Sequence, residues 1–400
     1  MLRNRPGLEW PDAPPTLPGM LRQAGYHTYL VGRSMHQYPE RQRFGFDHKI
    51  DHGEYRPWLE SHAPEGSGSY HGTGVMHNDW TARPWHLDES LHFTNWTVNE
   101  ALRFLRNRDP TCPFFLVVSF IAPHPPFVPP AFYMQRYLRM QLPQPVIGDW
   151  AVPPPNQGLG DPVDASRVHL TGERLHSCQA GYFGLINHID DQMRRILHPL
   201  SGLDFATAEH TVVIFTSDHG EMLGDHYLFR KSQPYEGSAR IPLLFSAPPR
   251  FGIEHRQVID KPVGLEDVMP TILEMAGLPV PDSVDGSSLL PLMRGEEVGW
   301  RRFLHLEHAP HERDRVGGFH SLVSDSEKYI WLAGDGREQL FDLEADPTEC
   351  RDLTRDPGAA ERVAHWRALL SDQLRDRPEG FSDGSRLIAG RRYPSVLGAQ

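Results

Sequence analysis

Residues 211–246, TVVIFTSDHGEMLGDHYLFRKSQPYEGSARIPLLFS, are the most informative part of the sequence about the fold. The stretch opens with one apolar run, 211–215, and closes with another, 241–246, each typical of a strand in the core of a sheet. Between these runs stand two His, two Asp, two Glu and one Lys. Such a dense set of charged and polar groups directly after a buried strand favours a functional loop over a merely solvated one.

Other segments extend this strand-and-loop pattern toward the N-terminus. Residues 16–24 predict a short helix and 26–32 a strand, while a helix over 93–108 leads into the apolar run FFLVVSF at 114–120, typical of a strand buried on both faces. The longest amphipathic pattern, 173–200, predicts the main helix. We expect an α/β fold with a mostly parallel central sheet flanked by helices, and polar residues converging after Phe120, Phe215 and Phe245.

Two segments lack a clear period. Residues 53–92 are rich in Gly, His, Pro and Trp and predict a long ordered loop near a site, and residues 141–164 predict a Pro-rich loop. After Gly299 the pattern changes to four short strands and a helix over about 359–377, which predicts a small antiparallel sheet with a covering helix. The expected organisation is therefore a core over 1–298 and a C-terminal subdomain over 299–400.

Composition limits the classes of function. The formal net charge of −12 disfavours nucleic acid and anionic membranes as partners. No apolar run reaches about 18 residues, so no transmembrane helix is expected, and the three scattered cysteines do not indicate a disulfide framework or a zinc site. We expect a cytoplasmic protein with a small-molecule partner, and the oligomeric state stays open.

The triplet Asp218-His219-Gly220 follows the 211–215 strand directly. A carboxylate and an imidazole at a strand end can both reach one divalent cation, and the glycine allows a close approach of the backbone. Taken alone, the triplet fits a structural turn equally well. The polar residues that follow it up to Glu236 shift the balance toward a metal site.

The chain resembles the sulfatase family of the alkaline phosphatase superfamily over nearly its whole length. Residues 216–245 resemble the signature SDHGE…GDH…K…PYE…R-[IV]-P, and three further stretches agree with the family: GYHTYLVGRSMHQYPERQRFGFDH at 25–48, PFFLVVSFIAPHPPF at 113–127 and LFDLEADPTECRDL at 340–353. The resemblance implies an alkaline-phosphatase-like fold and the metal-dependent hydrolysis of a sulfate ester, so the expected partner is a small-molecule sulfate ester.

The resemblance also implies roles for individual residues. Asp218 and His219 would be the metal ligands, and the expected ion is calcium, with magnesium and manganese as alternatives. Lys231 would stabilise the charge of the sulfate ester, and His124 would contact the sulfate or protonate the leaving alcohol.

Two further assignments depart from the family's pattern. His36 would assist the nucleophile, but Gly32-Arg33-Ser34-Met35-His36 has one residue more than Gly-Lys-x-His and no Lys. Arg33 would then take over the cationic role and bind substrate, although a guanidinium is not equivalent to an ammonium. His226 is a further candidate for substrate binding, with an anchoring role in the loop as the alternative.

The nucleophile is absent by motif. Family members begin with a strand, a metal-binding Asp pair and Cys-x-Pro-x-Arg or Ser-x-Pro-x-Arg, whose first residue becomes formylglycine, whereas this sequence starts after that point. None of the three cysteines precedes Pro-x-Arg. Ser246 fits the bare pattern, but we interpret it as a coincidence because it follows the metal motif in chain order. The expectation is a truncated enzyme with weak metal affinity and little or no activity.

Two alternatives to sulfate ester hydrolysis stay open at this point. Related enzymes use the same constellation to hydrolyse phosphodiesters or phosphonate monoesters. From a different class, the chain could be a non-catalytic ligand-binding relic. The absent nucleophile favours the relic, and the retained Asp218, His219, Lys231 and His124 argue against it.

Overall fold

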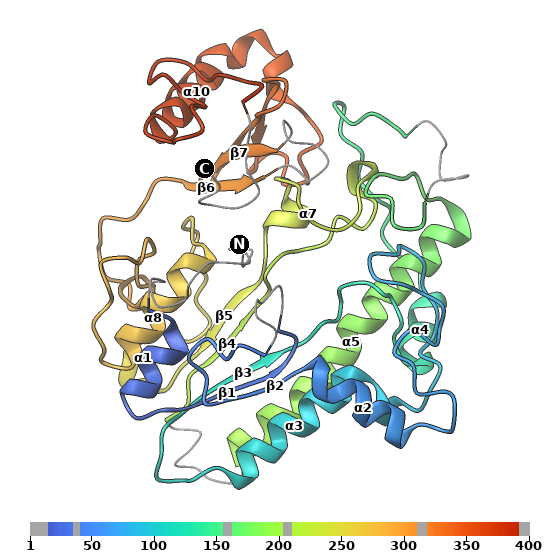
Figure 1. The fold of residues 1–400 in the computed structure, drawn as a ribbon. Helices are drawn as coiled ribbons and strands as arrows, with labels where there is room; N and C mark the ends of the chain where they lie inside the picture. Colours follow the sequence, from blue (N-terminus) through green and yellow to red (C-terminus); the bar gives the residue numbers. More distant parts are fainter. Residues whose placement is uncertain (1–14, 35–40, 155–161, 203–209, 310–317, 392–400) are drawn as a thin grey trace.

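A computed structural model describes residues 15–34, 41–154, 162–202, 210–309 and 318–391. Within these ranges it contains a three-stranded parallel sheet, a two-stranded antiparallel pair and a four-stranded antiparallel sheet, with helices around them (Figure 1). The predicted α/β fold with a separate antiparallel sheet near the C-terminus is confirmed. No helix in the described ranges is long and apolar enough to cross a membrane.

The parallel sheet has the order β2-β1-β3, so β1 is its central strand. Its register pairs Tyr29 with His48 on one side and with Leu116 on the other. Helices α3 and α5 pack on one face and α1 with α8 on the other (Figure 1). The strands are β1 (His27–Gly32), β2 (His48–Ile50) and β3 (Phe114–Ser119), and the covering helices are α1 (Leu17–Gln23), α3 (Phe93–Asn107), α5 (Gly172–Gly202) and α8 (Val268–Met275).

Local sequence explains where several helices begin. Thr16 accepts a hydrogen bond from the N–H of Gly19 and so caps α1, and His92 caps α3 by accepting from the N–H of Thr94. The remaining helices are α2 (His52–His62), α4 (Ala131–Leu138), α7 (Glu236–Ala239), α9 (Leu290–Met293) and α10 (Ala360–Gln373). The helices expected over 16–24, 93–108, 173–200 and 359–377 are thus confirmed within a few residues.

Helix α2 corrects one prediction, because residues 53–92 do not form a single irregular loop. Asp51 and Glu54 form a capping box that starts this helix, and Tyr55 and Leu59 bury one face of it. Gly53 and Pro57 hide the helix in the sequence, since both residues normally weaken helices. A capping box and an apolar i, i+4 pair outweigh them here.

The strands that flank the Asp218 loop form an antiparallel pair, β4 (Val213–Thr216) with β5 (Leu243–Ser246). They are not buried on both faces, as Leu244 is 58% exposed, and all six residues of β3 are half-buried. The expectation of fully buried strands is therefore wrong for β3, β4 and β5. In the described part of the chain, β3 is an edge strand and β4 and β5 form only a pair, so neighbouring strands cover them incompletely.

The C-terminal sheet has the simple order β6-β7-β8-β9, with α10 packed on one face. Leu322, Tyr329 and Trp331 meet Trp366 and Leu370 of α10 there, and the other face contacts the core through Ile330 and Phe341. The strands are β6 (Leu304–His308), β7 (Phe319–Val323), β8 (Glu327–Leu332) and β9 (Glu338–Asp342). This sheet begins at Leu304, and the exact division into 1–298 and 299–400 stays a prediction.

Candidate functional site

The candidate site lies where β1, β3 and β4 end. Arg33 follows β1 and His124 follows β3, and these two strands run parallel, so the loops after them leave the same edge of the sheet. The loop after β4 meets them, because the ring of His219 lies 5.9 Å from that of His124, centroid to centroid. The predicted convergence after Phe120 and Phe215 is confirmed.

The convergence expected after Phe245 is wrong. Strand β5 runs antiparallel to β4, with Leu243 opposite Thr216 and Ser246 opposite Val213. Ser246 therefore lies beside the start of β4, whereas Asp218 follows the end of that strand. At about 3.3 Å per residue the two ends of β4 are roughly 10 Å apart. This position supports the interpretation of the Ser246 motif as a coincidence.

Gly32 brings the loop after β1 close to β3. Its φ is +105°, and a Cβ at this position would lie 2.0 Å from the carbonyl oxygen of Ser119. The next residue, Arg33, donates its backbone N–H to that same oxygen at 2.8 Å. Only glycine fits here without strain, and the fit fixes where Arg33 enters the site.

His219 is prepared to act as a metal ligand beside Asp218. Its Nδ1 donates to the carbonyl oxygen of Gly220 at 2.8 Å, which leaves the lone pair on Nε2. This Nε2 is buried, has no hydrogen-bond partner among the described residues, and lies 3.7 Å from Oδ1 of Asp218. Burial lowers the pKa of His219, so the imidazole is neutral near pH 7. The donor set of one imidazole and one carboxylate fits a divalent cation.

Lys231 and His124 form a hydrogen-bonded pair beside His219. His124 donates from Nδ1 to the carbonyl oxygen of Pro125 at 2.6 Å, and its Nε2 accepts from the Lys231 ammonium at 2.5 Å. Burial and the Lys231 charge lower the pKa of His124 to about 3. Burial and the nearby Arg33 lower the pKa of Lys231 to about 8. The imidazole is thus the acceptor of the pair, and the ammonium is its proton donor.

Arg33 adds a second cation to the site. Burial lowers its pKa, and Asp218 is the charge that opposes this shift most strongly. The Arg33 charge in turn acts on His124, His219 and Lys231, which places it among them. Two half-buried cations beside neutral imidazoles create a local positive field in a protein whose net charge is −12. The site is suited to binding an anion.

The loop that carries Lys231 is held in an unusual backbone conformation. Arg230 and Ser232, on either side of Lys231, have φ values of 66° and 73°, in the left-handed region that non-glycine residues rarely adopt. The carboxylate of Glu221 accepts hydrogen bonds from the N–H groups of Leu223 and Arg230 and so closes the loop. Such strain persists only where surrounding contacts enforce it, and it is common at functional sites.

The C-terminal sheet anchors the other end of this loop. Lys328 of β8 is 1% exposed, and its ammonium contacts Glu236 at 2.6 Å, Glu349 at 2.8 Å and the carbonyl oxygen of Pro234 at 2.9 Å. Glu349 also accepts from the N–H of Glu236 at 2.6 Å. A buried ion network around Lys328 of the C-terminal sheet therefore holds segment 234–236 in place.

The comparison with known proteins assigns this geometry to a family. The sequence profile of the sulfatase family matches residues 9–278, and that of the N-sulphoglucosamine sulphohydrolase C-terminal region matches residues 224–376. An arylsulfatase of Clostridium perfringens (strain 13 / Type A) is 37% identical over 97% of this chain and 83% of its own length. The chain belongs to the sulfatase family.

A second relative agrees with this assignment, and a solved structure shares the fold. A choline-sulfatase of Rhizobium meliloti (strain 1021) is 30% identical over 90% of this chain and 73% of its own length. The crystal structure of a phosphonate monoester hydrolase of Agrobacterium radiobacter shares the fold with a TM-score of 0.70 at 23% identity, covering 94% of this chain and 83% of that one. As a member of the sulfatase family, the chain is a sulfuric ester hydrolase, and this family generally binds a divalent metal ion.

Two residues predicted for the site, His226 and His36, are not part of the His124–Lys231 cluster as the structure describes it. His226 is buried against Trp150 and Tyr235, and its Nδ1 accepts from the N–H of Gly148 at 3.0 Å. These contacts favour the anchoring role of His226. Its role in substrate binding stays a prediction. His36 lies outside the described residues, so its assistance to the nucleophile also stays a prediction.

The sequence alone did not single out a group of aromatic and imidazole side chains beside Arg33. Burial is the largest cause of the pKa shifts of Tyr70, His52 and His77, and the Arg33 charge also acts on each of these pKa values. Burial raises the pKa of Tyr70 to about 12 and lowers that of His52 to about 4. All three are uncharged near pH 7. The only sequence signal was the density of His and aromatic residues in 53–92.

Proposed function

We propose that Arg33, His124, Asp218, His219 and Lys231 bind the sulfate group of a sulfate ester and promote its hydrolysis. The observation that carries this proposal is the buried Nε2 of His219, which has no hydrogen-bond partner within the described ranges and lies beside Asp218 and the Lys231–His124 pair. One side of the cluster supplies donors for a cation, and the other supplies charge for an anion. A sulfate group between them would be held by both.

Asp218 and His219 would hold the divalent ion, and calcium is the ion we propose, with magnesium and manganese as alternatives. Such an ion polarises an ester oxygen and offsets negative charge when bound. Asp218 and His219 are two ligands from the described residues, which is few for a calcium site, since calcium normally has 6–8 oxygen ligands. We therefore propose weak metal affinity for this chain.

Lys231 and His124 would stabilise and protonate the leaving group. The ammonium of Lys231 donates to Nε2 of His124, so a proton is available at this pair even though the imidazole itself is neutral. We propose that an oxygen nucleophile from outside this cluster forms the new bond to sulfur as the S–O bond of the ester breaks. Lys231 then stabilises charge on the departing oxygen, and the pair delivers the proton to the leaving alcohol. Arg33 would bind a remaining sulfate oxygen, since a guanidinium donates in a planar fork.

The decisive experiment assays the chain on an aryl sulfate and on an aryl phosphonate monoester, each with and without added Ca²⁺. We expect at most slow metal-dependent turnover, with the sulfate preferred, and sulfate binding that calorimetry detects. The Lys231→Ala variant should lose both, whereas the exposed Lys261→Ala should behave as the wild type. Sulfate binding that survives in Lys231→Ala would refute the proposed site, and a preference for the phosphonate would change the substrate class.

A further inference from the structure

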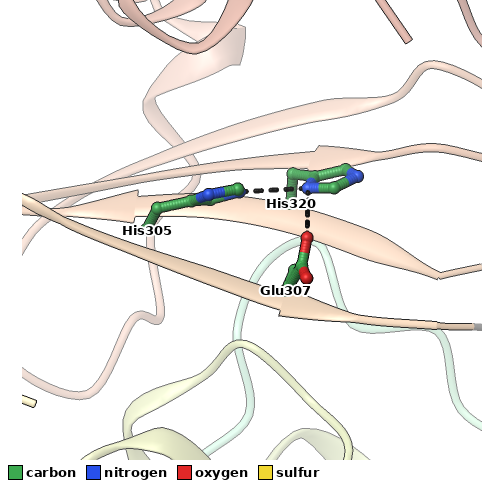
Figure 2. Close-up of side chains that lie close together, drawn as sticks. All are labelled: His305, Glu307 and His320. Carbon is green, nitrogen blue, oxygen red and sulfur yellow. Dashed lines mark hydrogen bonds and ion pairs between the residues drawn. The ribbon is translucent and has the colours of Figure 1, made fainter. Parts of the chain in front are cut away.

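Three side chains able to bind a metal converge on the C-terminal sheet, away from the site described above (Figure 2). His305 and Glu307 are two residues apart on β6, so they point to the same face of the sheet, and His320 of β7 lies directly opposite Glu307. This is the face that α10 covers, since Leu322 and Trp331 share it. Lys328, which anchors the active-site loop, points to the opposite face.

The spacing of the donor atoms fits a small tetrahedral ion. Nε2 of His305 is hydrogen-bonded to Nδ1 of His320 at 3.0 Å, and that Nδ1 lies 3.6 Å from Oε2 of Glu307. A metal ion would displace the proton of this hydrogen bond. Zinc bonds to nitrogen and oxygen ligands of about 2.0–2.2 Å place neighbouring ligands in a tetrahedron about 3.3–3.6 Å apart. Small rotations of the side chains would therefore bring all three onto one ion.

The surroundings keep both imidazoles neutral and leave one side open. His320 is buried between Trp331 and Phe381, with ring centroids 5.9 Å and 4.9 Å away, and burial lowers its pKa to about 3. Burial also lowers the pKa of His305. The Glu307 side chain is 38% exposed, which provides an entry for an ion and room for a water ligand.

Arg377 lies beside this cluster, so its positive charge would repel a bound metal ion and compete with it for Glu307. Its guanidinium contacts Oε2 of Glu307 at 3.0 Å, and it also lies 3.0 Å from Oε1 of Glu379. Glu379 makes a second contact with it, from Nε to Oε2 at 3.2 Å. Arg377 therefore keeps a carboxylate partner if Glu307 turns toward a metal ion.

We propose that His305, Glu307 and His320 form a second metal site, one that binds a divalent transition ion such as Zn²⁺ with water in the fourth position. Two imidazoles and one carboxylate suit zinc better than calcium, which prefers oxygen ligands. The site is separate from Asp218 and His219, because it lies on the far face of the C-terminal sheet. It does not depend on the proposed hydrolysis.

The test measures zinc bound per chain after dialysis, by elemental analysis, in the 400-residue protein that carries Asp218→Ala and His219→Ala to remove the other candidate site. We expect about one zinc per chain in this background, with the tetrahedral absorption spectrum when Co²⁺ replaces it. Adding His305→Asn or Glu307→Gln should weaken zinc binding at least tenfold. His308→Asn changes a histidine of the same strand on the opposite face and should leave binding unchanged.

Glu307→Gln keeps the proposal testable if a histidine variant misfolds, because Glu307 is partly exposed and its replacement has the same size. Zinc should raise the melting temperature of the background protein and of His308→Asn, but not that of Glu307→Gln. A background protein that retains no zinc, or equal retention after His305→Asn and Glu307→Gln, would overturn the second site.

Discussion

Lys231 is the residue whose chemistry depends most on its surroundings. Burial and the Arg33 charge both disfavour its ammonium and lower its pKa to about 8, while Glu221 and Asp218 partly restore it. A lysine in this state is charged at neutral pH and still gives up a proton readily. It can therefore stabilise an oxyanion and take part in proton transfer.

Replacing Lys231 should affect both rate and pH dependence. Lys231→Ala should lower kcat/KM on an aryl sulfate by about 100- to 1,000-fold, the effect of losing one preorganised donor. If the ammonium is the active form, wild-type turnover should fall as the pH rises through about 8. In Lys231→Arg this alkaline fall should disappear, because a guanidinium stays charged. A pH–rate profile for each variant checks this, and an identical alkaline limb in Lys231→Arg would contradict it.

His219 should control metal affinity. His219→Ala removes the lone pair on the buried Nε2, so the Ca²⁺ concentration needed for half-maximal turnover should rise at least tenfold. Calorimetric titration with Ca²⁺ measures the same change without any substrate. His255→Ala, which removes an exposed histidine, is the matched control. Unchanged calcium affinity in His219→Ala would exclude this residue as a ligand.

At the scale of elements, the junction of β1 and β3 positions Arg33. Gly32 and Gly25 both have positive φ, but a Cβ at Gly32 would meet Ser119, whereas a Cβ at Gly25 would meet nothing within 4 Å. Gly25→Ala should cost about 1–2 kcal/mol from backbone strain alone. Gly32→Ala should cost a further 1–3 kcal/mol or so from the clash. Urea unfolding of both variants measures the difference in unfolding free energy. Equal losses of stability would show that the β3 backbone at Ser119 can move to accommodate the added methyl group.

At the scale of the whole molecule, the C-terminal sheet supports the active-site loop through Lys328. Removing one member of a buried ion network leaves an unpaired buried charge, which costs about 3–5 kcal/mol. Lys328→Met should therefore lower the unfolding free energy by about that amount and also reduce kcat, since segment 234–236 would lose its anchor. Denaturant unfolding and steady-state kinetics measure the two effects.

The triple variant Lys328→Met, Glu236→Gln and Glu349→Gln separates the ion network from simple packing. It removes all the charges together, so much of the stability lost in Lys328→Met should return. The loop should stay poorly fixed, and kcat should recover less than stability does. If the triple variant is as unstable as Lys328→Met alone, the loss arises from packing.

Elements that rest on local patterns could be predicted from the amino-acid sequence. Apolar runs located α1, α3, α5, α10 and every described strand except β2 within a few residues. The signature over 216–245 identified the family and the cluster of Asp218, His219 and Lys231. These signals are local in the chain, because period, capping and motif spacing involve residues only a few positions apart. Helix α2 was missed because Gly53 and Pro57 opposed the capping box beside them.

Features that depend on residues distant in the chain could be seen only in the folded structure. Because β5 runs antiparallel to β4, Ser246 lies at the end of the strand pair away from the site. The hydrogen bond between Lys231 and His124 joins residues 107 positions apart. Burial, which no single residue type reveals, lowered the pKa of Lys231. The fold also buried the Nε2 of His219 with no hydrogen-bond partner in the part of the chain that the structure describes. The network around Lys328 and the convergence of His305, Glu307 and His320 likewise arise from strand register, which the sequence of one strand does not specify.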